Sequence, residues 1–296
     1  MNAQVRVRQG AVHAAEWWSS LSGAERQIEL AVDCQRAARR PLVFSHATAA
    51  ALHGIPVIGG WPERAHATVA PGSDQSNPSM IRTERRLDPM DVCVTASGLR
   101  ATGLARTALD LAATRGALAG IVAYSHLRRH RSLEIEELRT GIRRAGRMAG
   151  IRIVRESLGR STADSDSPLE SLVVARCQEY GFVVPEQQRR VVSISGNVYF
   201  VDFAWLDGRI LGEADGYGKY GDPALLAGRE PADVVYREKL REDEIRLATG
   251  AFFRASWEDA WHGEPLRRLL VRVGVPRSVG APASRRSLRV FLSVSG

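Results

Sequence analysis

The chain has 296 residues, of which 44% are hydrophobic and 25% are charged, and its formal net charge is +8 at pH 7. This composition is typical of a folded soluble protein, and the length favours two domains. No apolar run approaches the roughly 20 residues of a membrane span, and the first residues lack the apolar core of a signal peptide. We therefore expect no membrane partner and a cytoplasmic location.

The positive charge indicates the kind of partner. An excess of cations favours a polyanion, either nucleic acid or an anionic membrane surface. Two of the 41 basic residues are lysine and the other 39 are arginine, and this arginine excess favours DNA; charge that serves solubility alone is the alternative. The cysteines, Cys34, Cys93 and Cys177, are scattered without metal-ligand spacing, which agrees with a reducing compartment.

The first half of the chain, residues 1–160, predicts a mixed domain of helices and strands. Helical periodicity that stops at Pro41 or Gly54 marks the first helices. Short apolar runs between turn-rich stretches mark strands. The expected helices are 25–40, 45–53, 103–114, 117–130 and 133–145, and the expected strands are 65–70, 80–86 and 92–95.

A polar linker at 161–166 separates this half from a second domain, residues 161–275. The expected order there is helix, three strands, helix, strand, helix. The ranges are 168–180, 186–194, 198–205, 209–215, 233–249 and 251–255, followed by a helix that Ser256 caps. Residues 276–296 are predicted to be a disordered basic tail. The fold class is therefore α/β, in an α+β arrangement.

Acidic residues in the second domain share one predicted hairpin. Asp207-Gly208 is a two-residue turn signal, so paired residue numbers sum to 415 and Asp202 faces Glu213. Asp215 shares the face of Glu213 because alternate residues of a strand point the same way. Directly opposed carboxylates destabilise a sheet unless a cation lies between them. The pattern predicts a metal site at Asp202, Glu213 and Asp215, and a solvated hairpin face is the alternative.

Both lysines of the chain follow this acidic hairpin. Lys219 comes six residues after Glu213, and Lys239 lies on the next predicted helix. An ammonium is a compact, strongly hydrated charge that guanidinium does not replace. We therefore expect one of the two to act at the acidic site, with coincidence as the alternative.

The acidic residues and their neighbours resemble the PD-(D/E)XK nuclease core. The matching segments are Ser167–Ser171 (SPLES), Val201–Trp205 (VDFAW), Glu213–Gly216 (EADG) with Lys219, and Glu238–Asp243 (EKLRED). The finer resemblance is to a family of unknown function related to very-short-patch-repair endonucleases. It implies a restriction-endonuclease-like core and metal-dependent hydrolysis of DNA, in phage defence, DNA repair or a toxin–antitoxin context.

The resemblance also implies roles for individual residues. Asp202 and Glu213 would hold Mg²⁺ or Mn²⁺, and Glu170 would orient the site from the first helix or else cap that helix. Lys219 or Lys239 would stabilise charge, because Asp215 stands where the family places its lysine. Arg237 and Arg241 would contact phosphates or pair with Glu238, Glu242 and Asp243 on their own helix.

The first half resembles the AbiEi-type antitoxin region often fused to this core. The matching segments are Ser45–Ala50, Leu52–Pro56 and Arg106–Asp110. Family members open with a winged helix-turn-helix, and residues 6–12 resemble only the end of its wing, so we expect the recognition helix to be missing. Because Asp215 stands where the family places its lysine, the alternative function is a non-catalytic DNA-binding regulator of antitoxin type with a degenerate nuclease core. A homodimer fits either function.

Overall fold

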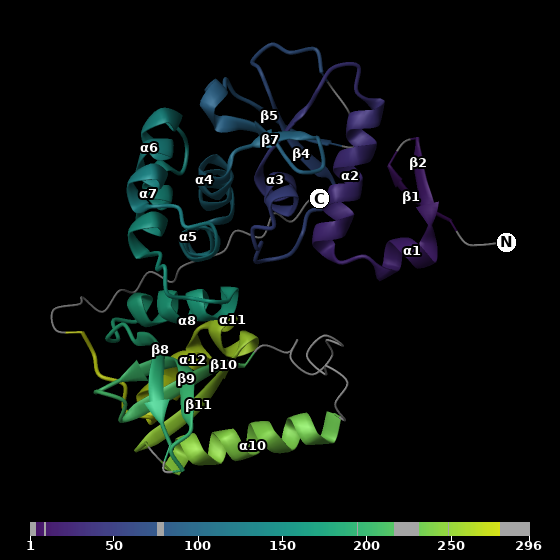
Figure 1. Ribbon diagram of the computed structural model, residues 1–296. Coiled ribbons are helices and arrows are strands. Elements are labelled where there is room, and N and C mark those ends of the chain that lie inside the picture. The colour runs from purple at the N-terminus through teal and green to yellow at the C-terminus, as the bar shows by residue number, and fades with distance from the viewer. Residues whose placement is uncertain are drawn as a thin grey trace. The chain divides into compact units, whose positions relative to one another are not determined.

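The computed structural model describes residues 4–8, 10–75, 80–193, 195–215, 231–247 and 249–278, without the side chains of 8 and 231–238 (Figure 1). The chain divides into two compact units between Ser161 and Thr162, one residue beyond the boundary expected at 160. Both units combine helices with mixed sheets, which confirms the predicted α+β class. Each unit is described by itself below.

The first unit is built on a five-stranded mixed sheet in the order β5-β4-β3-β7-β6. Its strands are β3 (Val43–Phe44), β4 (Ala65–Val69), β5 (Met80–Glu84), β6 (Val92–Val94) and β7 (Arg100–Thr102). β3 pairs antiparallel with β4 and parallel with β7. A separate antiparallel hairpin joins β1 (Gln4–Arg8) to β2 (Ala11–Ala14) and covers the segment that resembles a wing.

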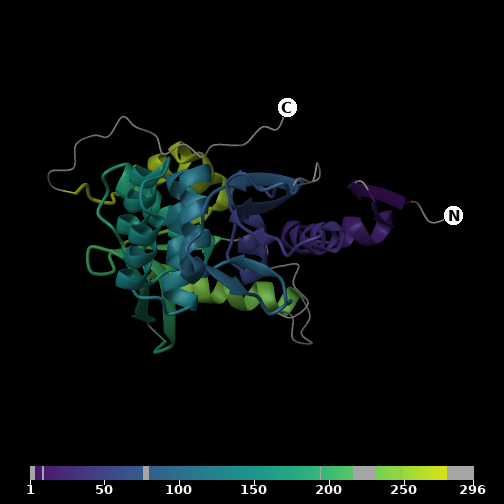
Figure 2. The ribbon, with the colours of Figure 1, turned by 90° about the horizontal axis from the view of Figure 1, so that it is seen from above.

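Helices of the first unit are α1 (Ala15–Ser20), α2 (Gly23–Ala37), α3 (His46–His53), α4 (Leu104–Arg115), α5 (Ala117–His130), α6 (Ile135–Ala145) and α7 (Ile151–Arg160). α4 to α7 pack side by side as a layer beside the sheet (Figures 1 and 2). Their shared core contains Leu109, Tyr124, Leu127 and Val154, all fully buried. α7 was not predicted, although its apolar residues Ile151, Val154 and Leu158 have helical spacing.

The second unit is a four-stranded sheet, in the order β11-β10-β9-β8, between two layers of helices (Figure 1). Its elements are α8 (Pro168–Glu179), β8 (Glu186–Val192), β9 (Val198–Trp205), β10 (Ile210–Asp215), α10 (Pro231–Leu247), β11 (Ala251–Ser256), α11 (Trp257–His262) and α12 (Glu264–Arg272). β8, β9 and β10 form an antiparallel meander, and β11 adds parallel to β10. The predicted element order is found.

The helices of this unit begin where capping residues stand. Ser167 Oγ accepts a hydrogen bond from the backbone of Glu170, and Pro168 occupies the first turn of α8. Ser256 and Asp259 form the predicted reciprocal capping box of α11. Gly212 lies in the middle of β10 because the ring of Phe253 covers it; an added Cβ would lie 2.6 Å from that ring.

The predicted tail begins later than expected. Pro276 O accepts from the backbone N–H of Val183 at 2.9 Å, and Ser278 N–H donates to Gly181 O at 2.9 Å. The Arg277 guanidinium lies 3.9 Å from the ring centre of Phe182. Residues 276–278 are therefore part of the second unit, which corrects the expected disorder from 276 onward. The remainder of the predicted tail, 279–296, lies outside the described residues.

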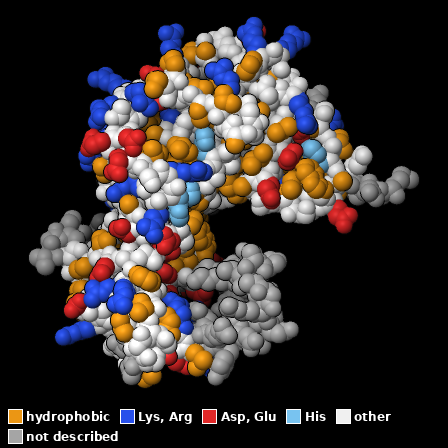
Figure 3. All heavy atoms as spheres, viewed as in Figure 1, with side chains coloured by type: hydrophobic (Ala, Val, Ile, Leu, Met, Phe, Trp, Pro, Cys, Tyr) orange, Lys and Arg blue, Asp and Glu red, His pale blue; other side chains and the backbone are white. Residues whose placement is uncertain are grey.

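None of the described helices combines the length and the apolar character needed to cross a membrane. On the face shown in Figure 3, basic and acidic side chains are interspersed over the first unit instead of forming a patch of one sign. Charge distribution alone therefore does not single out a binding surface on that face.

Candidate functional site

The predicted hairpin register is confirmed where β9 and β10 pair. Ile210 pairs with Trp205, Leu211 with Ala204 and Gly212 with Phe203, so each pair sums to 415. The loop is wider than the predicted two residues, because φ is already positive at Leu206 (49°) and stays positive at Asp207 and Gly208. The register is kept because β9 ends at Trp205, as predicted, and β10 begins at Ile210, one residue later than predicted.

Asp202 lies where β9 and β10 stop pairing. The next backbone donor of β10, Ala214 N–H, bonds to Asp202 Oδ2 at 2.7 Å instead of to a main-chain carbonyl. The carboxylate of Asp202 thus accepts the hydrogen bond that a main-chain carbonyl of β9 would accept in a regular ladder. Burial raises the pKa of Glu213, and the nearby negative charge of Asp202 adds to that rise. The two acids are therefore close enough to repel each other, although the paired ladder stops one pair before the predicted Asp202–Glu213 pair.

Gln188 links Asp202 to a third acidic residue, Glu170. On β8 it stands opposite Asp202, between the pairs Gln187–Phe203 and Arg189–Val201, and its φ is +52°. Its amide Nε2 donates to Glu170 Oε2 at 3.1 Å and reaches Asp202 Oδ1 at 3.5 Å. Sequence reasoning missed Gln188. The turn at 195–197 could have given its register, but not the direction of its side chain.

Glu170 takes part in both of the alternatives that the sequence left open. It stands at the third position of α8, and Oε2 accepts from the backbone N–H of Asp166 at 2.9 Å, one residue before the cap. The same oxygen accepts from Gln188. Burial raises the pKa of Glu170, and the charge of Asp202 contributes to the rise. The carboxylate therefore supports the helix start and also adjoins the acid pair.

Two arginines hold Glu213. Arg241 of α10 reaches Glu213 Oε1 at 2.5 Å, and Arg254 of β11 reaches Oε2 at 3.5 Å. Arg254 also lies 3.8 Å from Asp215 and 3.2 Å from Glu242. Arg241 thus reaches across the fold from α10 to Glu213 on β10. Arg254 was missed, although Glu213 is its register partner in the parallel pairing of β10 with β11.

The remaining predicted residues are not brought to the acids in the described structure. Lys239 is exposed on α10. Lys219 and the side chain of Arg237 lie outside the described residues. Across the described residues, the cations that contact Glu213 are therefore the two arginines, and neither lysine has a demonstrated place beside it.

The acids fit a hard divalent cation in kind and in number. Asp202 and Glu213 supply carboxylate oxygens, and Mg²⁺ is commonly bound by one or two carboxylates together with water and substrate phosphate. Within the described ranges, no three acidic, histidine or cysteine side chains form a metal-ligand group. Asp202 instead adjoins Glu170 on one side and Glu213 on the other. For Glu213 to bind a metal ion, at least one of its carboxylate oxygens would have to give up its contact with Arg241 or Arg254.

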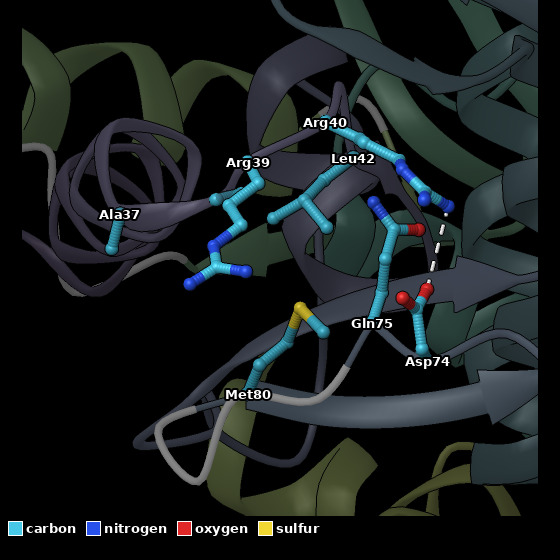
Figure 4. Close-up of a pocket in the computed structure, with 8 residues that line it drawn as sticks. Ala37, Arg39, Arg40, Leu42, Asp74, Gln75 and Met80 are labelled. Atoms are coloured by element: carbon cyan, nitrogen blue, oxygen red, sulfur yellow. Dashed lines mark hydrogen bonds and ion pairs between the residues drawn. The ribbon is translucent and has the colours of Figure 1, made fainter.

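A cavity in the first unit contains none of the predicted site residues. Figure 4 shows it where α2 ends, beside the loop that carries Asp74 and Gln75. Arg40 Nη1 lies 3.4 Å from Asp74 Oδ1 across the opening, and both side chains are exposed. Arg39, Leu42 and Met80 also line the wall. The charged groups of this cavity are exposed to solvent, whereas Glu170 and Glu213 of the second unit are buried.

The segment Arg106–Asp110 has a clear structural role. Arg106 Nε donates to Asp110 Oδ1 at 2.9 Å, and its Nη1 lies 3.6 Å from Asp91. Arg144 of α6 pairs with the same Asp91 at 2.9 Å. This buried network ties α4 to α6 and to the segment before β6.

Comparison with known proteins leaves the family open: no protein-family model matches the chain, and a search of curated proteins finds no match.

Proposed function

We propose that the second unit hydrolyses phosphodiester bonds of DNA with the help of a divalent metal ion, Mg²⁺ or Mn²⁺. The observation that supports this is the meeting of Glu170, Asp202 and Glu213, which come from three separate elements. Burial and mutual repulsion raise the pKa of Glu170 and of Glu213. Acids placed at such a cost in stability are typical of functional sites.

The chain's own residues would divide the work. Asp202 and Glu213 would hold the metal ion, which lowers the pKa of a bound water and offsets charge on the phosphate. Ala214 N–H and Gln188 Nε2 fix the orientation of Asp202. Because its pKa is raised, Glu170 keeps a proton at higher pH than an ordinary glutamate. It is therefore suited to give or take a proton beside the acid pair.

The test is cleavage by Asp202→Asn. Loss of one metal-holding carboxylate should lower Mg²⁺-dependent cleavage of plasmid and single-stranded DNA by at least about 100-fold, the scale of losing one charge-stabilising group. The variant should keep its fold, because asparagine retains an oxygen that accepts from Ala214. Asp207→Asn is the matched control, since Asp207 is 92% exposed in the hairpin loop. Cleavage by Asp202→Asn at the wild-type rate would exclude this site.

A second candidate function has one observation in its favour. Arg241 and Arg254 already neutralise Glu213, and such an arrangement suits a nuclease core that has become a binding module. We infer for this case a DNA-binding regulator of antitoxin type. It would bind DNA equally well with EDTA and with Mg²⁺, and the wild-type protein would cleave none of the substrates.

A further inference from the structure

An exposed apolar patch lies at the open end of the β8–β9 hairpin. Phe200 is 58% exposed, Val192 50% and Val198 45%. Val192 pairs with Val198, and Arg190 pairs with Phe200. Side chains of directly paired residues lie on the same face of a sheet. Phe200, Val192 and Val198, called the Phe200 patch below, are therefore neighbours, and Arg190 adjoins them on the same face.

Packing of the fold does not account for this patch. The residues on either side of Phe200 belong to the core of the unit: Val201 is fully buried, and Tyr199 packs against the same cluster as Ile245 of α10. The Tyr199 hydroxyl is also held by Glu244 at 2.7 Å. β9 is thus anchored on both sides of a phenylalanine that stays in solvent. A contiguous apolar surface of this kind indicates a binding site.

Cations flank the patch. Arg190 is exposed, and within the described part of the chain it forms no ion pair, whereas its neighbour Arg189 is held by Glu186 and Asp207. On the other side, Arg241 Nη2 donates to Phe200 O at 3.1 Å and to Glu213 Oε1 at 2.5 Å. One guanidinium nitrogen therefore connects the backbone of Phe200 to the acidic site.

We propose that the Phe200 patch is a stacking platform for an unpaired nucleobase, with Arg190 contacting the adjoining phosphate. Proteins hold single strands by an aromatic face beside a cation, and Arg190 is such a cation, which forms no ion pair with the described residues. A base offers its face in this way only when it is unstacked, so the ligand is single-stranded or locally open nucleic acid. A second copy of the chain fits less well, because it would add another Arg190 to the same surface.

The stacking platform rests on the proposed function in one respect: the bound strand is then also the substrate of the acidic site. Its test measures binding and requires no cleavage. Fluorescence anisotropy with a labelled oligothymidylate in EDTA should show affinity falling about 5- to 100-fold for Phe200→Ala. Phe200→Leu should recover little of it, and Phe200→Trp should retain or increase it. A duplex of the same length should bind these proteins with nearly equal affinity.

A strand that contains 2-aminopurine supplies an independent readout. Its fluorescence should be quenched on binding to the wild-type protein and less so with Phe200→Ala. Leu247→Ala is the control, since Leu247 is an exposed apolar residue of the same unit. Equal single-strand affinity of Phe200→Ala, Phe200→Leu and wild type would overturn the proposal. So would a dimer in sedimentation that Phe200→Ala dissociates. Phe200-dependent binding by a protein that cleaves nothing would reject the proposed hydrolysis and leave the platform in place.

Discussion

At the scale of single residues, the first unit contains a buried histidine, His46, stacked on a half-buried one, His66, and both favour the uncharged form. The rings of His46 and His66 stack with centres 3.8 Å apart and planes 2° from parallel. Burial lowers the pKa of His46 to about 3, and the nearby Arg106, Arg115 and Arg85 lower it further. Burial, then His46 and Arg115, lower the pKa of His66 to about 2. Two adjacent imidazolium ions would be unstable in this place.

The pair predicts how the first unit responds to acid. Both folded pKa values lie below the ordinary value of 6.5, so the unfolded chain takes up protons first as the pH falls. Stability contributed by the neutral histidines is present above pH 6.5 and is lost as the pH falls toward the folded values. Each histidine contributes a slope of up to about 1.4 kcal/mol per pH unit in this window.

His46→Asn should reduce this slope by about half between pH 6 and pH 4. Asparagine tolerates the positive φ of 53° at this position and does not titrate. The measurement is the free energy of unfolding by urea at several pH values, in which the slope matters and the absolute stability does not. The exposed His262 gives the control His262→Asn. An unchanged slope in His46→Asn would show that the pair is already protonated in the fold.

At the scale of elements, local signals predicted most of the second unit. The Asp207-Gly208 turn and strand parity predicted the β9–β10 register, and Ser167, Pro168 and Gly181 predicted the bounds of α8 to within one residue. β3 was missed because a strand of two residues is too short to show alternation. β7 was missed because its sequence, Arg-Ala-Thr, has one β-branched residue, whereas the equally short β6 is Val-Cys-Val.

Contacts within the candidate site were less predictable, because they join distant parts of the chain. Arg241 is 28 residues from Glu213, and Gln188 is 18 residues from Glu170. No local pattern indicates which arginine of α10 turns toward the sheet. The sequence therefore identified the acids but not the polar side chains that hold them.

The Arg241–Glu213 pair predicts a competition with metal ions. Arg241→Gln should bind divalent or trivalent cations more tightly, on the order of tenfold, because Glu213 then loses a positive neighbour. Binding of Tb³⁺, followed by its luminescence at pH 8, measures this directly. The alkaline pH matters because Arg241 lowers the pKa of Glu213, and its loss lets that pKa rise further.

Arg246→Gln is the matched control on the same helix, since Arg246 pairs with Glu242 and not with Glu213. It should leave Tb³⁺ affinity unchanged. Equal or weaker binding by Arg241→Gln would mean that Glu213 does not hold the cation.

At the scale of the whole molecule, each unit has a core and internal ties of its own. In the second unit, Arg176 of α8 is buried and pairs with Glu179 at 2.6 Å. Its Nε also donates to Ala260 O at 2.9 Å, and its Nη2 to Trp261 O. One side chain therefore fastens the end of α11 to α8, which carries Glu170 at its other end.

Arg176→Met should destabilise the second unit by about 3–5 kcal/mol, because it breaks the buried Arg176–Glu179 ion pair and removes the donor of two carbonyls. Hydrogen exchange followed by mass spectrometry should show faster exchange in α8, β9 and β10. Amides of α4 and α5, whose core lies wholly in the first unit, should keep their protection. Arg268→Met removes an exposed arginine of the same unit that pairs with Glu264, and it should change exchange little. Equal loss of protection in α4 and α5 would show that the two units unfold together, and the position of Glu170 would then depend on the entire chain.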